Sequence, residues 1–221
     1  TTVVYLVVFG NIAKLSTDGA PKILFYLAGI TLWNYFSSCL TATSNVFTTN
    51  ASIFGKVYFP RLIMPISIVL SNLMRFGVQM GLFLVVFVYY LFEGQVQPNW
   101  WILATPFLVF LMAVFALGMG MIFSSLTTKY RDLQMLLTFG ISLYMYATPV
   151  IYPASSLKGI FKTIAFYNPL TGIFECFKYA WLGVGDFNAP MLMISTILIF
   201  VILVIGTVTF NKVEKGFMDT V

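Results

Sequence analysis

The sequence predicts an all-α integral membrane protein with six transmembrane helices. Of its 221 residues 60% are apolar and 9% are charged, whereas about a quarter of the residues are charged in soluble globular domains. Long apolar runs alternate with short polar loops, and several runs reach the roughly 20 residues that a helix needs to cross the hydrocarbon core. We therefore expect residues 1–221 to form a single transmembrane domain.

The ionisable residues and cysteines exclude several classes of site. The net charge of +5 is spread over the loops, which suits contact with anionic lipid headgroups better than nucleic acid. The chain has no histidine, which excludes most zinc sites, histidine-based triads and imidazole proton relays. Cys39 and Cys176 lie inside apolar patterns and are interpreted as small hydrophobic residues. We expect no metal site.

The first apolar segment, residues 1–13, is too short to span the membrane, so we interpret it as the second half of a first transmembrane helix. A turn-rich polar loop follows at 14–22. Residues 23–49 form the second predicted span, with Trp33 and Tyr35 near its middle and a final part rich in Ser, Thr and Asn.

A polar and basic stretch at residues 50–65 separates the second and third spans. Its polar side chains would need partners inside hydrocarbon, and its prolines prevent one continuous helix. We therefore expect the chain to leave the bilayer here, form a short element and return. The residues concerned are Asn50, Ser52, Lys56, Arg61, Pro60 and Pro65.

The third predicted span covers 66–92. With its lead-in at 62–64 it has about 31 residues, or roughly 46 Å against a hydrocarbon core of about 30 Å, so it must tilt or project into water. The fourth span, 100–127, begins with Trp100 and Trp101 at the membrane interface. Its patch at 118–120 contains two glycines, which would let another backbone approach closely.

The fifth and sixth predicted spans cover 133–152 and 191–210, with a polar tail at 211–221. Between them, residues 154–188 show two helical patterns of about 13 residues each, interrupted at Asn168-Pro169. Glu175 and Lys178 take the polar side of the second pattern. We expect two amphipathic helices that lie at the interface or dip in and return.

This count of spans places residues 50–61, 128–132 and the tail on one side of the membrane. Residues 14–22, 93–99 and 154–188 lie on the other. Basic residues divide six against five, which favours a cytoplasmic location for the 50–65 loop and an extracytoplasmic location for the helix pair. Three of the five opposing lysines lie in that pair, where they would reach headgroups: Lys158, Lys162 and Lys178.

Five ordered motifs resemble one known family. They are DGAPKILFYLAGITLWNYFSS, TTNASIFGKVYFPRLIMPIS, KYRDLQ with TPVIYP, YNPLTGIFE and FNKVEKGFMD. Together they resemble the type-two permease subunits of ABC exporters, in the branch that exports lipid-linked polysaccharides such as O-antigen, capsule or teichoic-acid chains. The resemblance runs from residue 6 to 219. The sequence departs from the family in lacking the N-terminal interface helix and the first half of the first span, and in having Thr148 where serine is more frequent.

The resemblance implies a homodimer in the bacterial inner membrane that works with two copies of a separate ATPase subunit. ATP and Mg²⁺ would bind to that partner, and this chain would hold no cofactor. The residues at 50–59 would form a cytoplasmic coupling helix that contacts the ATPase. The implied coupling residues are Asn50, Ala51, Ser52, Ile53, Phe54, Gly55, Lys56, Val57 and Tyr58. The alternative is an ordinary connecting turn with basic anchors.

Arg131 and Asp132 match a second contact with the ATPase in that family. They have an equally simple structural interpretation, in which Asp132 caps the fifth helix and Arg131 anchors it at the interface.

Arg75 lies ten residues after Pro65, about 15 Å into the third span. Arginine near the bilayer centre costs about 2.5–3.5 kcal/mol on insertion scales, so it should face protein or water. One hypothesis is that it meets a phosphate of the substrate near the entrance to the transport path. The other is that it extends along a tilted helix to the cytoplasmic headgroups.

Aromatic residues within the spans are candidates for a sugar-binding path, because the resemblance implies an aromatic-lined conduit. The candidates are Trp33, Tyr35, Tyr144 and Tyr146, and ordinary helix packing is the alternative for each.

The sequence contains no GxxxxGK[ST] phosphate-binding loop, so we do not expect this chain to be an enzyme that hydrolyses ATP. Carboxylates within the spans are nearly absent, which argues against coupling to an ion gradient. The leading hypothesis is the membrane subunit of an ATP-driven exporter of a lipid-linked polysaccharide. The alternatives are an exporter of a drug or small amphiphile, a membrane-embedded glycan or lipid transferase, and a passive channel.

Overall fold

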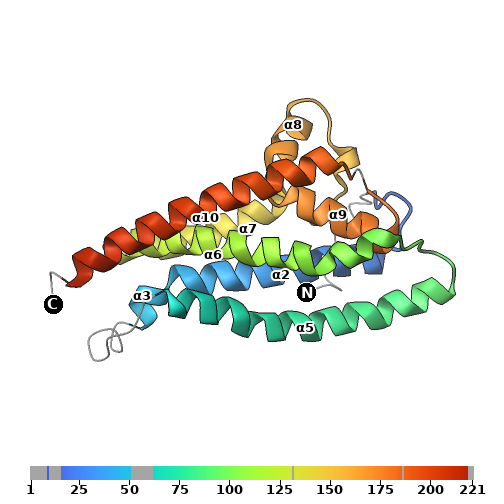
Figure 1. Cartoon of the computed structure of the whole chain (residues 1–221). Helices are drawn as coiled ribbons and strands as arrows, with labels where there is room; N and C mark the ends of the chain where they lie inside the picture. The colour runs from blue at the N-terminus through green and yellow to red at the C-terminus, as the bar shows by residue number, and fades with distance from the viewer. Residues whose placement is uncertain (1–8, 10–15, 51–61, 131, 186, 219–221) are drawn as a thin grey trace.

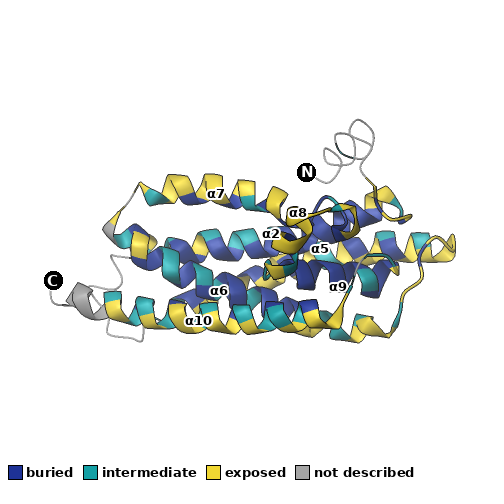
Figure 2. Cartoon of the chain, turned by 90° about the horizontal axis from the view of Figure 1, so that it is seen from above, coloured by how far each residue is buried: buried dark blue, intermediate teal, exposed yellow. Residues whose placement is uncertain are grey.

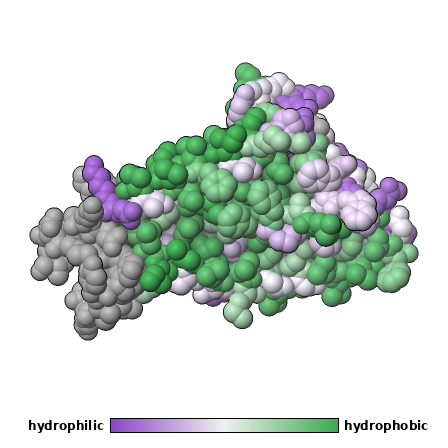
Figure 3. Space-filling model, in the orientation of Figure 1, coloured by the Kyte–Doolittle hydropathy of each residue, from purple (hydrophilic) through white to green (hydrophobic). Residues whose placement is uncertain are grey.

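The computed structural model is a bundle of long helices, and it describes residues 9, 16–50, 62–130, 132–185 and 187–218. Every regular element in this part of the chain is a helix, which confirms the all-α prediction. Four helices, at Lys22–Ser44, Ile63–Phe92, Trp100–Thr128 and Ala189–Val213, are long and apolar enough to cross a membrane. The space-filling view shows a hydrophobic surface over the body of the bundle (Figure 3).

The central helix is α2 (Lys22–Ser44), which is buried over most of its length. It packs against α5 (Ile63–Phe92) and against α6 (Thr105–Lys129), and α6 in turn packs along α10 (Ala189–Met218). These helices run along the same long axis (Figure 1). Seen from above, α7 and α10 carry many exposed residues while α2 is mostly buried (Figure 2).

Helix α5 buries one narrow face, at Val69, Asn72, Phe76, Phe83 and Phe87. This spacing of three, four and seven residues is the repeat of one helix face. Apart from a polar stripe at Ser67, Ser71 and Arg75, much of the remaining surface is exposed and apolar, as expected where lipid surrounds a helix. At 30 residues α5 is roughly 45 Å long, which agrees with the predicted overlong third span.

The fifth predicted span is shorter than expected, because α7 covers only Leu133–Ala147. Thr148 is extended, with φ −110° and ψ 144°, as is common for a residue that precedes proline. The chain then turns across α2, where the Val150 carbonyl lies so close to Gly29 that a side chain there would clash. Fifteen residues extend roughly 22 Å, less than the hydrocarbon core.

Two helix ends also differ from the prediction. The second span is interrupted at Asn45, after which α3 (Val46–Thr49) adds one turn. The last helix, α10, continues through much of the predicted tail to Met218. Lys212, Glu214 and Lys215 favour helix and no proline stops it. Apart from Phe9, the first predicted span lies outside the described residues, so the six-span prediction is not confirmed.

The predicted close approach at residues 118–120 is confirmed. A Cβ atom on Gly118 would lie 2.9 Å from Leu203 Cα, and a Cβ atom on Gly206 would clash with the Gly118 carbonyl. Gly120 lies against the Thr43 side chain. Small residues therefore bring α6 into backbone contact with α10 and seat it against α2.

The predicted helix pair is present as α8 (Ile160–Tyr167) and α9 (Thr171–Leu182). Helix α8 exposes Ile160, Phe161 and Ile164, a surface suited to a membrane interface. Helix α9 inserts among the other helices. Its Phe177 and Trp181 rings contact Phe83 at 5.6 and 5.5 Å.

The expectation that Lys178 reaches headgroups is wrong, and the polar side that it shares with Glu175 faces protein. Both side chains are fully buried, with the Lys178 ammonium 3.4 Å from a Glu175 carboxylate oxygen. The polar side of α9 faces the Thr148–Pro153 turn, which offers backbone carbonyls as hydrogen-bond acceptors. Lys178 donates to the Pro149 and Tyr152 carbonyls at 2.6 and 3.2 Å, and its ammonium lies 4.3 Å from the centre of the Phe25 ring.

Burial lowers the pKa of Lys178, and the neighbouring Glu175 carboxylate offsets part of that shift. Glu175 also accepts a hydrogen bond from the Ala154 amide at 3.3 Å. This pair therefore fixes α9 to the segment that follows α7.

The loops gather at two opposite ends, as the span count predicted. At one end Ser155 donates to Asp18 at 2.7 Å and Asn99 donates to the Tyr179 carbonyl at 3.0 Å. At the other end Thr127 donates to the Ser44 carbonyl at 2.8 Å, and the rings of Phe47 and Phe210 lie 4.6 Å apart. Figure 1 shows α8 and α9 at the first end and α3 at the second.

Candidate functional site

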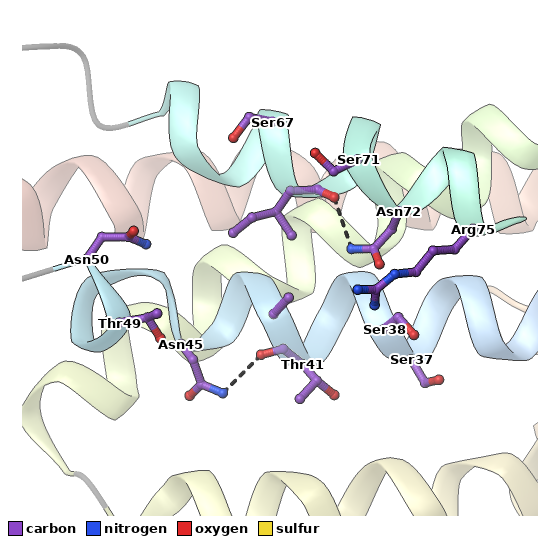
Figure 4. Close-up of a pocket in the computed structure, with 12 residues that line it drawn as sticks. Ser37, Ser38, Thr41, Asn45, Thr49, Asn50, Ser67, Ser71, Asn72 and Arg75 are labelled. Atoms are coloured by element: carbon purple, nitrogen blue, oxygen red, sulfur yellow. Dashed lines mark hydrogen bonds between the residues drawn. The ribbon is translucent and has the colours of Figure 1, made fainter.

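A polar groove of about 810 Å³ lies between α2 and α5 and is shown in Figure 4. We call it the α2–α5 groove. Ten of its twelve lining residues have a hydroxyl, amide or guanidinium group, and none is acidic. The lining residues are Ser37, Ser38, Thr41, Ala42, Asn45, Thr49, Asn50, Ser67, Ile68, Ser71, Asn72 and Arg75.

Helical spacing produces this polar wall. Along α2 and α3 the positions 37, 41, 45 and 49 follow one another at intervals of four, as do 67, 71 and 75 on α5. Residues four apart share one helix face, so each helix directs a polar stripe towards the other. A Gln79–Asn34 hydrogen bond of 3.3 Å joins the two helices further along.

Among the described residues, Arg75 is the one charged residue that lines the groove. Its guanidinium points from α5 towards α2, beside Ser38 (Figure 4). The described residues provide it with no carboxylate partner. A guanidinium has five donors and no acceptor, so the groove offers several donors for an anion.

The amides of the groove are partly used. Asn45 and Asn72 each donate to the carbonyl four residues earlier in their own helix, at 3.0 Å. The Asn45 side-chain oxygen is buried and has no hydrogen-bond partner in the described part of the chain. The ligand-facing chemistry of the groove is therefore that of the Arg75 donors and the neighbouring hydroxyl groups, a combination that suits a ligand with both phosphate and hydroxyl groups.

A second cavity, of about 400 Å³, lies between α2 and α7. It shares Ser37 and Thr41 with the α2–α5 groove, so the two are neighbours around α2. Trp33 and Tyr146 both line it, together with Thr138 and Ser142 from α7. The structure therefore brings two of the predicted aromatic residues together beside hydroxyl groups.

A third cavity, of about 340 Å³, lies between α6 and α7 and we call it the α6–α7 cleft. Its walls are almost entirely hydrocarbon and thioether groups. They consist of Leu40, Met119, Phe123, Leu126, Leu133, Leu136, Leu137, Gly140, Ile141 and Tyr144. Predicted Tyr144 thus lies on the other flank of α7 from Tyr146, and its hydroxyl donates to Asn168 at 2.7 Å.

Tyr35 lines none of these three cavities. Its ring lies 5.2 Å from that of Phe76, and its hydroxyl donates to the Val69 carbonyl at 3.5 Å. This arrangement corresponds to the alternative given for Tyr35, ordinary packing between α2 and α5.

The predicted coupling residues 51–58 and Arg131 lie outside the described residues. Asn50 is described: it ends α3, donates to the Val46 carbonyl at 3.0 Å and lines the α2–α5 groove. Asp132 occupies the N-cap position of α7, but its side chain makes no capping hydrogen bond. It is exposed.

The hydroxyl and amide residues that line the groove were not predicted from the sequence. The signal was present, because the end of the second span is rich in Ser, Thr and Asn. Polar residues recur there at intervals of four, at 37, 41, 45 and 49. The same interval recurs in the third span at 67, 71 and 75, and the two series together indicate two facing polar stripes. Arg75 is exposed where it lines this groove.

Comparison with known proteins gives a consistent assignment. The family model described as ABC-2 type transporter matches residues 1–182. The chain is 30% identical over 197 residues to the O-antigen export system permease protein RfbA of Klebsiella pneumoniae, which covers 89% of this chain and 74% of that protein.

Two further relatives agree. The chain is 28% identical over 155 residues to the protein of the same name from Myxococcus xanthus, covering 70% of this chain and 57% of that protein. It is 22% identical over 228 residues to the inner membrane transport permease YadH of Escherichia coli strain K12, covering 98% of this chain and 85% of that protein. The chain therefore belongs to the ABC-2 type transporter family of membrane permeases.

Proposed function

We propose that this protein is the membrane-spanning subunit of an ATP-driven exporter that moves a lipid-linked polysaccharide across the bacterial inner membrane. The observation that carries the proposal is the α2–α5 groove, where Arg75 lies among hydroxyl and amide groups and the described residues give it no acidic partner. Relatives named as O-antigen export permeases support the choice of substrate class.

The groove chemistry matches the two polar parts of such a substrate. Arginine binds phosphate oxygens through paired, charge-assisted hydrogen bonds. Serine, threonine and asparagine side chains can both donate and accept, as sugar hydroxyls require. A guanidinium within a membrane span raises the free energy of insertion, so its presence there indicates a functional role. We infer that Arg75 receives the phosphate of the lipid-linked substrate.

The second cavity extends this path. Trp33 and Tyr146 line it beside Thr138 and Ser142, and aromatic faces next to hydroxyl groups suit sugar rings. The two cavities share Ser37 and Thr41. If the phosphate of the substrate binds Arg75, the glycan attached to it can therefore contact the polar surface of the second cavity.

Energy would come from a separate ATPase. We propose that two copies of this chain assemble with two ATPase subunits, which bind ATP and Mg²⁺, and that residues 50–58 form the contact. Asn50 supports this arrangement because it closes α3 and also lines the groove. Movement at residues 50–58 would thus reach the substrate site directly, as in a lever that moves as a rigid body.

The test is to co-purify the chain with its candidate ATPase and to measure ATP turnover in nanodiscs. We expect stimulation by a lipid-linked oligosaccharide, and little by the unglycosylated lipid phosphate or by amphiphilic drugs. Failure of an ATPase to co-purify would contradict the ATP-driven mechanism. Stimulation by drugs and not by the glycolipid would replace the polysaccharide with a small amphiphile as substrate.

A further inference from the structure

The α6–α7 cleft differs in chemistry from its neighbours. Nine of its ten lining residues have no polar side-chain group, and the tenth, Tyr144, directs its hydroxyl to Asn168 at 2.7 Å. No free polar group therefore faces the cleft from the described residues. A ligand with a polar or charged part would lose its hydrogen bonds there, so the cleft suits a hydrocarbon.

The cleft is also elongated. Its α7 wall runs from Leu133 to Tyr144, a rise of roughly 16 Å along a helix. On α6 the wall runs from Met119 to Leu126, a rise of roughly 10 Å. A slot of this shape fits an extended chain better than a compact molecule.

The three cavities adjoin one another in a row, of which the first two are polar and the third is apolar. The α2–α5 groove, with Arg75, shares Ser37 and Thr41 with the α2–α7 cavity. That cavity shares Ile141 with the α6–α7 cleft. An amphiphile could therefore keep its anionic end in the α2–α5 groove while its chain reaches the α6–α7 cleft. Helix α7 lies between the polar α2–α7 cavity and the apolar cleft.

We propose that the α6–α7 cleft binds the hydrocarbon chain of the exported lipid-linked substrate. This inference rests on the proposed function, because the groove at Arg75 supplies the anionic end of the same molecule. The cleft adjoins the α2–α7 cavity, which adjoins the groove, and this neighbourhood distinguishes the substrate from bulk phospholipid, which needs only the exposed apolar surface of the bundle.

Gly140 provides a specific test. It lines the cleft, and a Cβ atom built on it meets no atom within 4 Å. Gly140→Leu would therefore fill the cleft without moving the backbone. Gly81 on α5 is the matched control, because a Cβ atom there also meets nothing within 4 Å and Gly81 lines none of the three cavities.

The experiment uses the permease–ATPase complex in nanodiscs of phosphatidylethanolamine and phosphatidylglycerol. The probe is a polyprenyl phosphate with a diazirine in its chain, and labelled peptides are mapped by mass spectrometry. We expect labels within 119–126 and 133–144 that unlabelled polyprenyl phosphate removes and added phosphatidylglycerol does not. Gly140→Leu should lower this labelling about tenfold, the factor that displacing two buried methylenes corresponds to. Gly81→Leu should leave it unchanged.

Three results would overturn the proposal: competition by phosphatidylglycerol equal to that by polyprenyl phosphate, unchanged labelling in Gly140→Leu, or protection of the cleft by a second copy of the chain or by residues 1–15. ATP turnover in the same samples separates the two proposals. If the glycolipid stimulates turnover while the cleft stays unlabelled, only the chain-binding site fails. If the glycolipid does not stimulate turnover, the proposed function fails.

Discussion

Arg75 holds a permanent positive charge among hydroxyl and amide groups, and its surroundings explain why it is tolerated in a membrane helix. The sequence analysis left two possibilities, contact with a substrate phosphate or extension to the headgroups. The structure points the guanidinium at α2 beside Ser38, inside the α2–α5 groove (Figure 4). This orientation favours the first possibility and makes it testable.

We predict that Arg75→Gln lowers glycolipid-stimulated ATP turnover about 10- to 100-fold, since hydrogen bonds to charged groups contribute roughly 1.5–3 kcal/mol. Arg75→Lys should retain intermediate activity, because lysine keeps the charge and loses the paired geometry. Turnover is measured at subsaturating glycolipid. Lys158→Gln, at an exposed position outside the groove, serves as the control. Full activity of Arg75→Gln would show that Arg75 only contacts headgroups.

Glu175 and Lys178 form a second charged feature, buried at the other end of the molecule. Their pattern in the sequence correctly places them on one side of α9. Periodicity does not say whether that side meets water or protein. In the structure it meets protein, because Lys178 donates to the carbonyls of Pro149 and Tyr152. Such carbonyls belong to a distant turn, which no local pattern reveals.

Glu175→Gln or Lys178→Met alone should destabilise the protein by about 3–5 kcal/mol, because each leaves a buried charge without its partner. The double variant should cost less than the sum of the two, with a coupling of about 0.5–3 kcal/mol. Unfolding in detergent, followed by tryptophan fluorescence, measures this cycle. Strictly additive effects would mean that the two groups do not interact.

At the scale of elements, the sequence predicted helices more accurately than their ends. The spans that became α2, α5, α6 and α10 were recognisable from their apolar length. The early end of α7 comes from Pro149 and from the passage of Val150 over Gly29. Proline was visible in the sequence, whereas the passage over α2 depends on tertiary contacts.

The contact between α6 and α10 gives a prediction at this scale. Gly118→Ala should destabilise the protein by about 1–3 kcal/mol, because the added methyl group would meet the Leu203 backbone at 2.9 Å. Gly77→Ala on α5 should be neutral or stabilising by up to about 1 kcal/mol, since its Cβ meets open space and alanine favours helix. Thermal unfolding of both variants checks the difference in sign. Equal effects would contradict the close packing of α6 on α10.

For the whole molecule, the arrangement of loops at two ends followed from the sequence, because alternate loops must lie on opposite sides of a membrane. The cavities did not follow from it. The α2–α5 groove and the α6–α7 cleft each lie between helices that are near each other in the sequence. Periodicity assigns residues to a helix face, but tertiary packing decides whether a space remains between two faces. The chemistry of the site could be anticipated at Arg75, Trp33 and Tyr146, whereas the position of these residues in two neighbouring cavities could not.

The central claim is that ATP hydrolysis by a partner drives a lipid-linked polysaccharide through this permease. The most direct measurement is ATP-dependent translocation of a labelled glycolipid in proteoliposomes that contain the permease and its ATPase. A variant with residues 50–58 replaced by a Gly/Ser sequence of equal length tests the coupling segment. We predict translocation by the original chain only with ATP, and loss of translocation together with weaker ATPase association in the variant. Translocation that persists without ATP, or in the variant without any bound ATPase, would contradict the account.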